Sequence, residues 1–234
     1  MIEKHVNRQR KLEDKRPIMF RLSDIVPNLD AWMMHSARSA HLTYAPQSVD
    51  ASFPPFSEIS VTTPGDKKAA AEQGFVSNGS KVFRLFCLSF HHFDDEQAKR
   101  VIKSTLETSD AVAIIELQDR RVGSLILMLL EFWLLFLISA LWFWHNKLHL
   151  LLTYYLPILP FIHCFDGFVS CLRTRTFEET MHLVADVQGG KAAIREDSLG
   201  RLRRGDWVFS HRRSLHTWPV GHMDFIFGKK IVEK

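Results

Sequence analysis

The feature that most constrains this chain is an apolar stretch from Val122 to Trp144, VGSLILMLLEFWLLFLISALWFW. Four of its 23 residues depart from that character: Gly123, Ser124, Glu131 and Ser139. A helix rises about 1.5 Å per residue, so one of this length covers the ~30 Å hydrocarbon core of a bilayer. Arg120-Arg121 precedes the stretch and two tryptophans end it, as expected of anchors at a membrane interface. The stretch therefore predicts a membrane helix.

A second apolar run extends from Leu148 to Phe165 and contains Pro157 and Pro160, which break or kink a helix. Arginines precede and follow the whole apolar region, so both flanks are expected on the cytosolic side of a membrane. This favours a hairpin or a re-entrant pair over a single crossing. The alternative is a buried helical hairpin in a large core, and Glu131 favours it because a carboxylate at mid-bilayer is costly.

The chain has 234 residues, a formal net charge of +4 and a pI of about 9.0, which makes it mildly basic. Much of the basic excess lies in residues 191–213, beside the apolar region, and predicts contact with anionic lipid headgroups. No nucleic-acid-binding motif is present, so no nucleic-acid partner is expected. The three cysteines, Cys87, Cys164 and Cys171, stand in apolar surroundings and predict reduced thiols rather than a disulfide framework.

Outside the apolar region, strand patterns alternate with helix patterns, which predicts an α/β fold with a mostly parallel sheet and helices on both faces. The expected strands are 18–24, 42–45, 81–90, 111–117, 207–210 and 223–227, the last two as an antiparallel pair. The expected helices are 2–15, 29–40, 95–108 and 176–187, with a possible single turn at 67–73. The predicted organisation is an α/β region at 1–120, a membrane-associated helical insert at 121–172 and a completing segment at 173–234.

Two of the expected strands are predicted to be buried. Residues 81–90 have the composition of a strand that is covered on both faces, which makes Cys87 an inert packing residue. Residues 111–117 are similar in character and end at a carboxylate. The helix that follows the first of these strands begins with Asp94 and Gln97, three residues apart, as a capping box requires.

Acidic and polar residues follow four of the expected strands. These positions are Asp24, Asp50, the segment Ser89–Phe93, and Glu116. Ligands of sheets with parallel strands bind at the carboxyl ends of the strands, where the loops converge. The four positions therefore predict one ligand pocket.

The ordered segments Leu22–Asn28, Pro46–Ala51 and Ser89–Asp95 resemble class I S-adenosylmethionine-dependent methyltransferases. They are similar in particular to a fungal and bacterial subgroup with apolar helices after the fifth strand. Asp166–Arg173 and the closing strand pair also match, so the resemblance covers the chain from Phe20 onward. It implies a Rossmann-like methyltransferase sheet that ends in a hairpin and carries a membrane-associated helical hairpin as an insert.

The resemblance also implies roles for single residues. Asp24 matches the acidic residue that accepts hydrogen bonds from the cofactor ribose, and Asp50 matches the acidic residue near the adenine. Ser89 and Phe90 match the cofactor-lining segment, while His91 or His92 would be the general base. The methyl acceptor would be a small lipophilic molecule that reaches the site from membrane lipid.

One departure from the family bears on catalysis. Family members begin with a strand and a glycine-rich cofactor loop, whereas the first glycine here is Gly65. In this family the missing strand is central, and its loss would leave two strand edges unpaired and open to a protein partner. The expected function is a membrane-associated methyltransferase-like protein with incomplete catalysis. The rival is a non-enzymatic, membrane-anchored scaffold or pseudoenzyme.

Two histidine pairs raise the question of a metal site. His91 and His92 are adjacent, and on a strand their side chains would point to opposite faces, which disfavours a shared ion. His145 and His149 would lie on one face of a helix, but their position beside the apolar region is typical of interface histidines. No metal site is expected.

Overall fold

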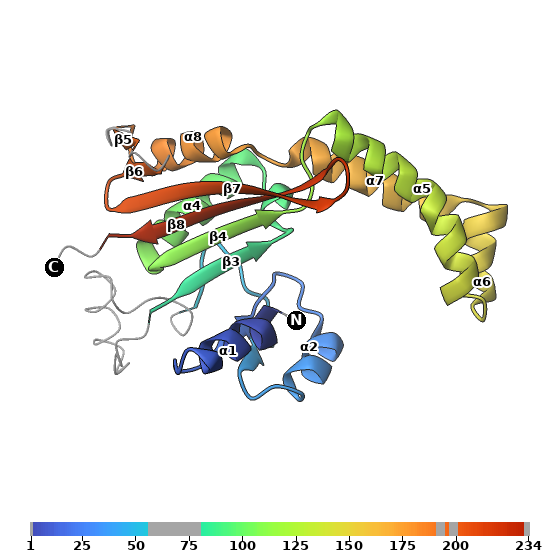
Figure 1. The fold of residues 1–234 in the computed structure, drawn as a ribbon, viewed down its shortest axis with the longest axis horizontal. Helices are drawn as coiled ribbons and strands as arrows, with labels where there is room; N and C mark the ends of the chain where they lie inside the picture. Colours follow the sequence, from blue (N-terminus) through green and yellow to red (C-terminus); the bar gives the residue numbers. More distant parts are fainter. Residues whose placement is uncertain (1, 56–80, 191–194, 197–200, 232–234) are drawn as a thin grey trace. The chain divides into compact units, whose positions relative to one another are not determined.

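The computed structural model describes residues 2–55, 81–190, 195–196 and 201–231 (Figure 1). The chain divides into two compact units, Met1–Ile59 and Ser60–Lys234, and each has its own sheet. The boundary between the units falls inside the predicted α/β region at 1–120. The helical turn expected at 67–73 lies outside the described residues.

The first unit contains a β-α-β arrangement. Strand β1 (Phe20–Leu22) leads through α2 (Leu29–Ser36) to β2 (Leu42–Tyr44), and the two strands pair in parallel. Helix α1 (Ile2–Leu12) precedes them. A helical crossover is what a parallel pair of strands requires, so this part of the α/β prediction is confirmed.

The second unit has a mixed sheet with the strand order β3-β4-β8-β7-β6-β5. Its strands are β3 (Phe83–Cys87), β4 (Ala111–Glu116), β5 (Arg195–Glu196), β6 (Leu202–Arg204), β7 (Trp207–Thr217) and β8 (Gly221–Lys230). Strands β3 and β4 are parallel, whereas the other pairings are antiparallel. The predicted mostly parallel sheet is therefore wrong for this unit. Short turns join β6 to β7 and β7 to β8, and a short turn can connect only antiparallel neighbours.

Helices α4 (Asp95–Thr108) and α8 (Phe177–Val187) pack on one face of this sheet, around a small apolar cavity. Their apolar faces are buried, on α4 through Ala98, Val101, Ile102 and Leu106. Both helices begin with a capping box. The side chain of the N-cap residue, Asp94 or Thr176, accepts a hydrogen bond from the backbone N–H three residues later. The side chain of that later residue, Gln97 or Glu179, accepts one from the N-cap backbone N–H. The predicted helix positions are confirmed.

The opposite face of the sheet is partly exposed at β3. Phe83 is 53% exposed and Phe227 is 42% exposed, and their ring centroids lie 6.2 Å apart. The prediction of a β3 strand covered on both faces is wrong, because β3 stands at the end of the described strand order. Cys87 is exposed rather than buried. Partial burial and the Glu116 carboxylate raise the pKa of its thiol, so it stays protonated and a poor nucleophile.

The apolar region forms an arm of helices that extends away from the sheet (Figure 1). We call residues 122–173 the α5–α7 arm: α5 (Val122–Trp142), α6 (Lys147–Leu150), a π-helical turn η3 (Leu151–Tyr155) and α7 (Ile158–Arg173). By length and composition α5 could cross a membrane, and 11% of its apolar window is buried. The segments before and after Leu156-Pro157 meet at 71°, which confirms the predicted break.

The polar residues of α5 face the rest of the arm. Ser124, Glu131 and Ser139 recur at spacings that place them on one side of a helix. Glu131 Oε1 lies 3.0 Å from His163 Nε2 on α7, and Ser139 Oγ lies 3.2 Å from His149 Nε2. Ser124 is buried and donates to a carboxylate at the base of α5. The mid-helix carboxylate is thus paired with protein, and His149 is engaged by a serine.

Gly228 on β8 offers a test of how tightly the sheet packs. A Cβ added there would lie 2.6 Å from Phe209 Cε1 and 2.9 Å from Val112 Cγ1. We expect Gly228→Ala to lower the free energy of unfolding by about 1–3 kcal/mol, the usual cost of overpacking a core. Urea unfolding of the purified chain measures it. In a double-mutant cycle with Phe209→Leu the cost of the alanine should shrink, and an undiminished cost would exclude the ring clash as its cause.

Candidate functional site

The carboxyl ends of β3 and β4 carry a tight turn that holds the predicted histidines. Leu88 has a φ of 53°, a left-handed conformation that is costly for leucine, and its N–H donates to Ile115 O at 2.9 Å. The chain then enters η2, a 3₁₀ turn over Phe90–His92. Successive side chains of a 3₁₀ turn are about 120° apart around the axis, whereas those of a strand point to opposite faces. The His91 and His92 rings can therefore approach each other, and their centroids lie 4.3 Å apart. The expectation that they sit on a strand and point to opposite faces is wrong.

Glu116, the last residue of β4, holds this turn through its buried carboxylate. Its Oε1 accepts from the backbone N–H groups of Phe90 at 3.0 Å and His91 at 3.2 Å. Its Oε2 lies 2.8 Å from His91 Nδ1, and the two side chains are only 5% and 7% exposed. Since a carboxylate accepts, Nδ1 donates the proton of this bond. His91 is therefore oriented by an acid but shielded from solvent.

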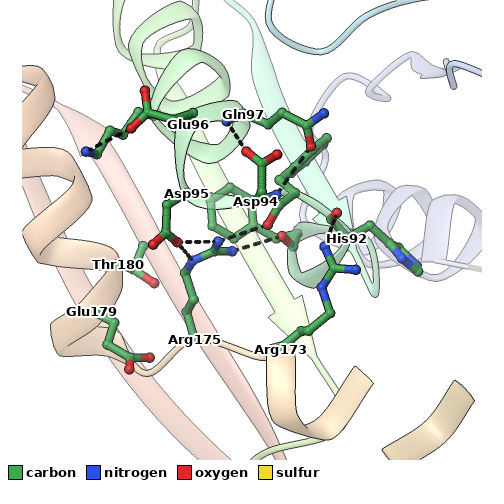
Figure 2. A network of polar contacts seen from close by, with 12 residues as sticks. His92, Asp94, Asp95, Glu96, Gln97, Arg173, Arg175, Glu179 and Thr180 are labelled. Carbon is green, nitrogen blue, oxygen red and sulfur yellow. Dashed lines mark hydrogen bonds and ion pairs between the residues drawn. The ribbon is translucent and has the colours of Figure 1, made fainter. Parts of the chain in front are cut away.

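His92 is the exposed member of the pair. Figure 2 shows its ring pointing away from the surrounding polar network. Its backbone carbonyl accepts a hydrogen bond of 2.8 Å from Arg173 Nη2. Of the two predicted general bases, His92 is the one whose ring nitrogens a molecule from outside can reach.

The two predicted cofactor-lining residues in this unit differ in their surroundings. Phe90 is buried, and its ring makes edge contacts with Phe86 and Phe93 at centroid distances of 5.9 and 5.8 Å. Its side chain is thus part of the core and does not face a ligand. Ser89 is half-buried at the start of η2, and its hydroxyl makes no cap hydrogen bond.

Two arginines, Arg173 at the end of α7 and Arg175 just after it, hold η2 from the other side (Figure 2). Besides the Arg173 bond, Arg175 Nη2 donates to Phe93 O at 2.9 Å and to Asp95 Oδ1 at 2.7 Å. Its guanidinium also lies 5.8 Å from the centre of the Phe90 ring. Sequence reasoning treated these cations as membrane flanks and missed this role, since nothing local in the sequence reports a contact across 80 residues.

A third arginine ties the base of the arm together. Arg120 Nε donates to Leu172 O at 2.8 Å, and its Nη1 lies 2.7 Å from Glu179 Oε1. Burial opposes ionisation of Glu179, but the Thr176 N–H and Arg120 outweigh it and lower its pKa. Both ends of the arm's polypeptide are therefore fixed to the sheet domain by charged hydrogen bonds.

A second polar cluster, also missed, lies beside Glu116 on β8 and β7. Arg213 forms ion pairs with Asp119 and with Asp224, the latter at 3.2 Å. His211 Nε2 lies 2.7 Å from Asp224 Oδ1. Asp224 stands directly opposite Glu116 in the antiparallel register, so two carboxylates sit side by side and each has its own partners.

Asp24 and Asp50 lie together in the first unit, in loops after β1 and β2. The Val49 N–H donates to the Asp24 carbonyl at 2.9 Å and joins the two loops. Both carboxylates are exposed. Asp24 Oδ1 accepts from Val26 N at 2.9 Å, and Asp50 Oδ1 accepts from Ser52 N at 2.8 Å. The predicted site residues thus form two groups, one in each unit.

In the described part of the chain, no group of three or more histidine, cysteine, aspartate or glutamate side chains is arranged to hold a metal ion. A hollow of about 510 Å³ lies between the α4 surface and the end of α8, and Lys99 is among its lining residues. Lys99 donates hydrogen bonds to the Asp186 and Glu96 carboxylates, which raise its pKa, so it stays charged and ion-paired. The hollow offers no catalytic group.

A comparison with known proteins found no family model that matches this chain and no curated protein that is similar to it in sequence. A functional proposal has to stand on the residues and geometry described above.

The role of Glu116 can be measured directly. We expect Glu116→Gln to lower the free energy of unfolding by about 1.5–3 kcal/mol, because the amide keeps the size but loses the charge and one acceptor. Urea unfolding provides the value. Glu178→Gln, an exposed site on α8, is the matched control and should change little. Equal stability of the two variants would mean that the carboxylate does not hold η2.

The Asp95–Arg175 pair predicts a pH dependence. The Arg175 hydrogen bond and charge lower the pKa of Asp95 below its usual value. The pair therefore stabilises the fold above the unfolded pKa of about 3.9, and this contribution disappears as pH falls through the lower folded pKa. Asp95→Asn should be slightly less stable than wild type at pH 7, and the two should converge in acid. A gap that persists at pH 2 would argue against this origin.

Proposed function

We propose that this chain is a membrane-associated, S-adenosylmethionine-dependent methyltransferase-like protein. The observation that carries the proposal is the pair of loops with Asp24 and Asp50. These loops follow two parallel strands of one β-α-β arrangement and are joined by the Val49–Asp24 backbone hydrogen bond. Carboxylates at the ends of adjacent parallel strands suit a ligand with several hydroxyl groups.

The residues present fit one half of the cofactor. Asp24 would accept from the ribose hydroxyls and Asp50 would border the adenine, and the local turns that both make already orient their carboxylates. When bound, S-adenosylmethionine supplies an electrophilic methyl group. Residues 2–55 contain no glycine and hence no glycine-rich loop for the methionine half.

His92 is the group in the second unit best suited to accept a proton from a methyl acceptor. Its imidazole is exposed, and histidine is the side chain that most often serves as a general base. His91 acts as a positioning residue, because Glu116 fixes its ring and its ring lies against His92.

The α5–α7 arm supports membrane attachment, with the α/β domain on the cytosolic side. Its long helix is exposed, although it is apolar enough to span a bilayer. Each polar side chain of α5 has a polar partner within the protein, Ser124 with Asp119, Glu131 with His163 and Ser139 with His149, as lipid surroundings require. Arginines stand where the chain enters the arm and where it leaves it, at Arg121 and Arg173, which agrees with a cytosolic position of the domain. A lipophilic methyl acceptor would reach the domain from the membrane.

A non-enzymatic scaffold is the second candidate, and two observations favour it. Phe83 leaves an apolar side chain exposed on the end strand β3, where a partner's strand could add to the sheet. In addition, His91 is occupied by a structural bond to Glu116. Such a protein would fold and bind membrane without any affinity for the cofactor.

Calorimetry with S-adenosylmethionine on the detergent-purified full chain separates the two candidates. The methyltransferase-like protein should bind in the micromolar range and lose binding at least tenfold in Asp24→Ala and in Asp50→Ala, since each removes a charge-assisted acceptor worth about 1.5–3 kcal/mol. Asp30→Ala is the matched control, an exposed acidic residue of the same unit. A folded chain without measurable binding would reject the cofactor and favour the scaffold.

A further inference from the structure

The surface of α5 is apolar on nearly every side. The exposed side chains Val122, Leu130, Trp133, Leu137 and Leu141 share one side of the helix, and flanking positions such as Leu125, Met128 and Phe132 are apolar as well. The exception is the inward polar seam of Ser124, Glu131 and Ser139. A helix that lies in the plane of a membrane surface needs a polar face toward water, which α5 lacks. Its 21 residues rise about 31 Å, close to the thickness of the hydrocarbon core.

The two ends of the arm carry side chains of the kind found at membrane interfaces. At the far end, Trp142, Phe143 and Trp144 are exposed. At the near end, Arg121 and Arg173 are exposed where the arm meets the sheet domain. The apolar section of α5 is thus bounded by an aromatic band and a cationic band, and the near band should carry aromatic residues as well.

An aromatic residue for the near band, Trp218, lies on a different element, the turn between β7 and β8. Figure 1 shows this turn at the base of the arm. Val220 packs on Gly123, where an added Cβ would lie 2.7 Å from Val220 Cβ. Gly221 packs against Leu127 in the same way, at 2.9 Å. The turn is therefore fixed to the first two turns of α5, while Trp218 at its tip is 83% exposed.

We propose that the tip of the β7–β8 hairpin, through Trp218, enters the headgroup layer of the anionic bilayer that the arm crosses. This inference rests on the membrane attachment proposed above. Arg121 and Arg173 provide the charge complement for anionic headgroups, and the exposed indole stands two residues before Val220, which packs on Gly123 beside the exposed Val122. The arm alone would let the arm and the sheet tilt together in the bilayer. A second, rigidly attached contact fixes the depth and tilt of the sheet.

Insertion of the hairpin tip into the headgroup layer has a consequence for the candidate site. Arg173 ends α7 and donates to the His92 carbonyl, so His92 lies at the depth of the near band. An acceptor that reaches the His92 ring would come from the headgroup layer itself. The substrate class is then a membrane-resident molecule whose reactive hydroxyl or amine lies at the interface.

A fluorescent probe at the hairpin tip tests the inference. In a background of Cys87→Ser, Cys164→Ala and Cys171→Ala, Trp218→Cys is labelled with an environment-sensitive fluorophore. The full chain is then placed in phosphatidylcholine/phosphatidylserine vesicles. The matched control is Asp206→Cys, at the opposite end of β7 in the same hairpin. Flotation of the vesicles reports membrane attachment independently of the probe.

We expect the probe at position 218 to be quenched by lipids with a nitroxide near the headgroup and to be shielded from iodide. The probe at position 206 should be open to iodide. Flotation with equal iodide access at both positions would overturn the inference and leave membrane attachment intact. No flotation would overturn both. If the probe at position 218 is shielded from iodide without lipid, and more so at higher protein concentration, the hairpin tip contacts a second copy of the chain, and the inference is overturned.

A milder variant guards against misfolding of the cysteine-free background. Trp218→Phe in the otherwise native chain changes one exposed side chain and should not affect folding. In vesicles with lipids brominated high on the acyl chains, the wild type should lose more tryptophan fluorescence than this variant. Equal quenching of the two proteins would place Trp218 in water and overturn the inference.

Discussion

The buried Glu116 carboxylate is the interaction on which the histidine turn depends. A buried charge is costly unless it is hydrogen-bonded, and here two backbone N–H groups and one imidazole satisfy it. The same three bonds compensate for the strained backbone at Leu88, because they fix the residues that follow it. The end of β4 thus determines where η2 stands, and η2 determines which histidine is exposed.

Arginines extend this dependence from the sheet to the arm. Arg173 and Arg175 bind η2 and the start of α4, while Arg120 joins the entry and exit of the arm. Guanidinium groups suit this role because each offers several donors in a fixed plane. The candidate catalytic turn and the apolar helices therefore behave as one rigid assembly within the second unit. The arm orients the turn as well as attaching it.

Local signals in the sequence predicted most of the helices and strands, and long-range pairing was the part they could not predict. The capping residue Asp94 and the helix that follows it at 95–108 were identified because their signals lie within one or two turns of the chain. The edge position of β3 and the antiparallel sheet depend on which strands meet across the chain, and periodicity does not report that. The Asp119–Arg213 pair was missed for the same reason.

The central pairing of the sheet has a consequence for biosynthesis. Ile114 on β4 pairs with Ile226 on β8, and the whole arm lies between them in the chain. During translation β4 emerges with its inner edge unpaired, and all the apolar helices of the arm emerge before β8 exists. The sheet therefore closes last, after the whole arm has left the ribosome. A ribosome stalled before β8 would leave a half-finished sheet with an unpaired strand edge as a target for chaperones or proteases.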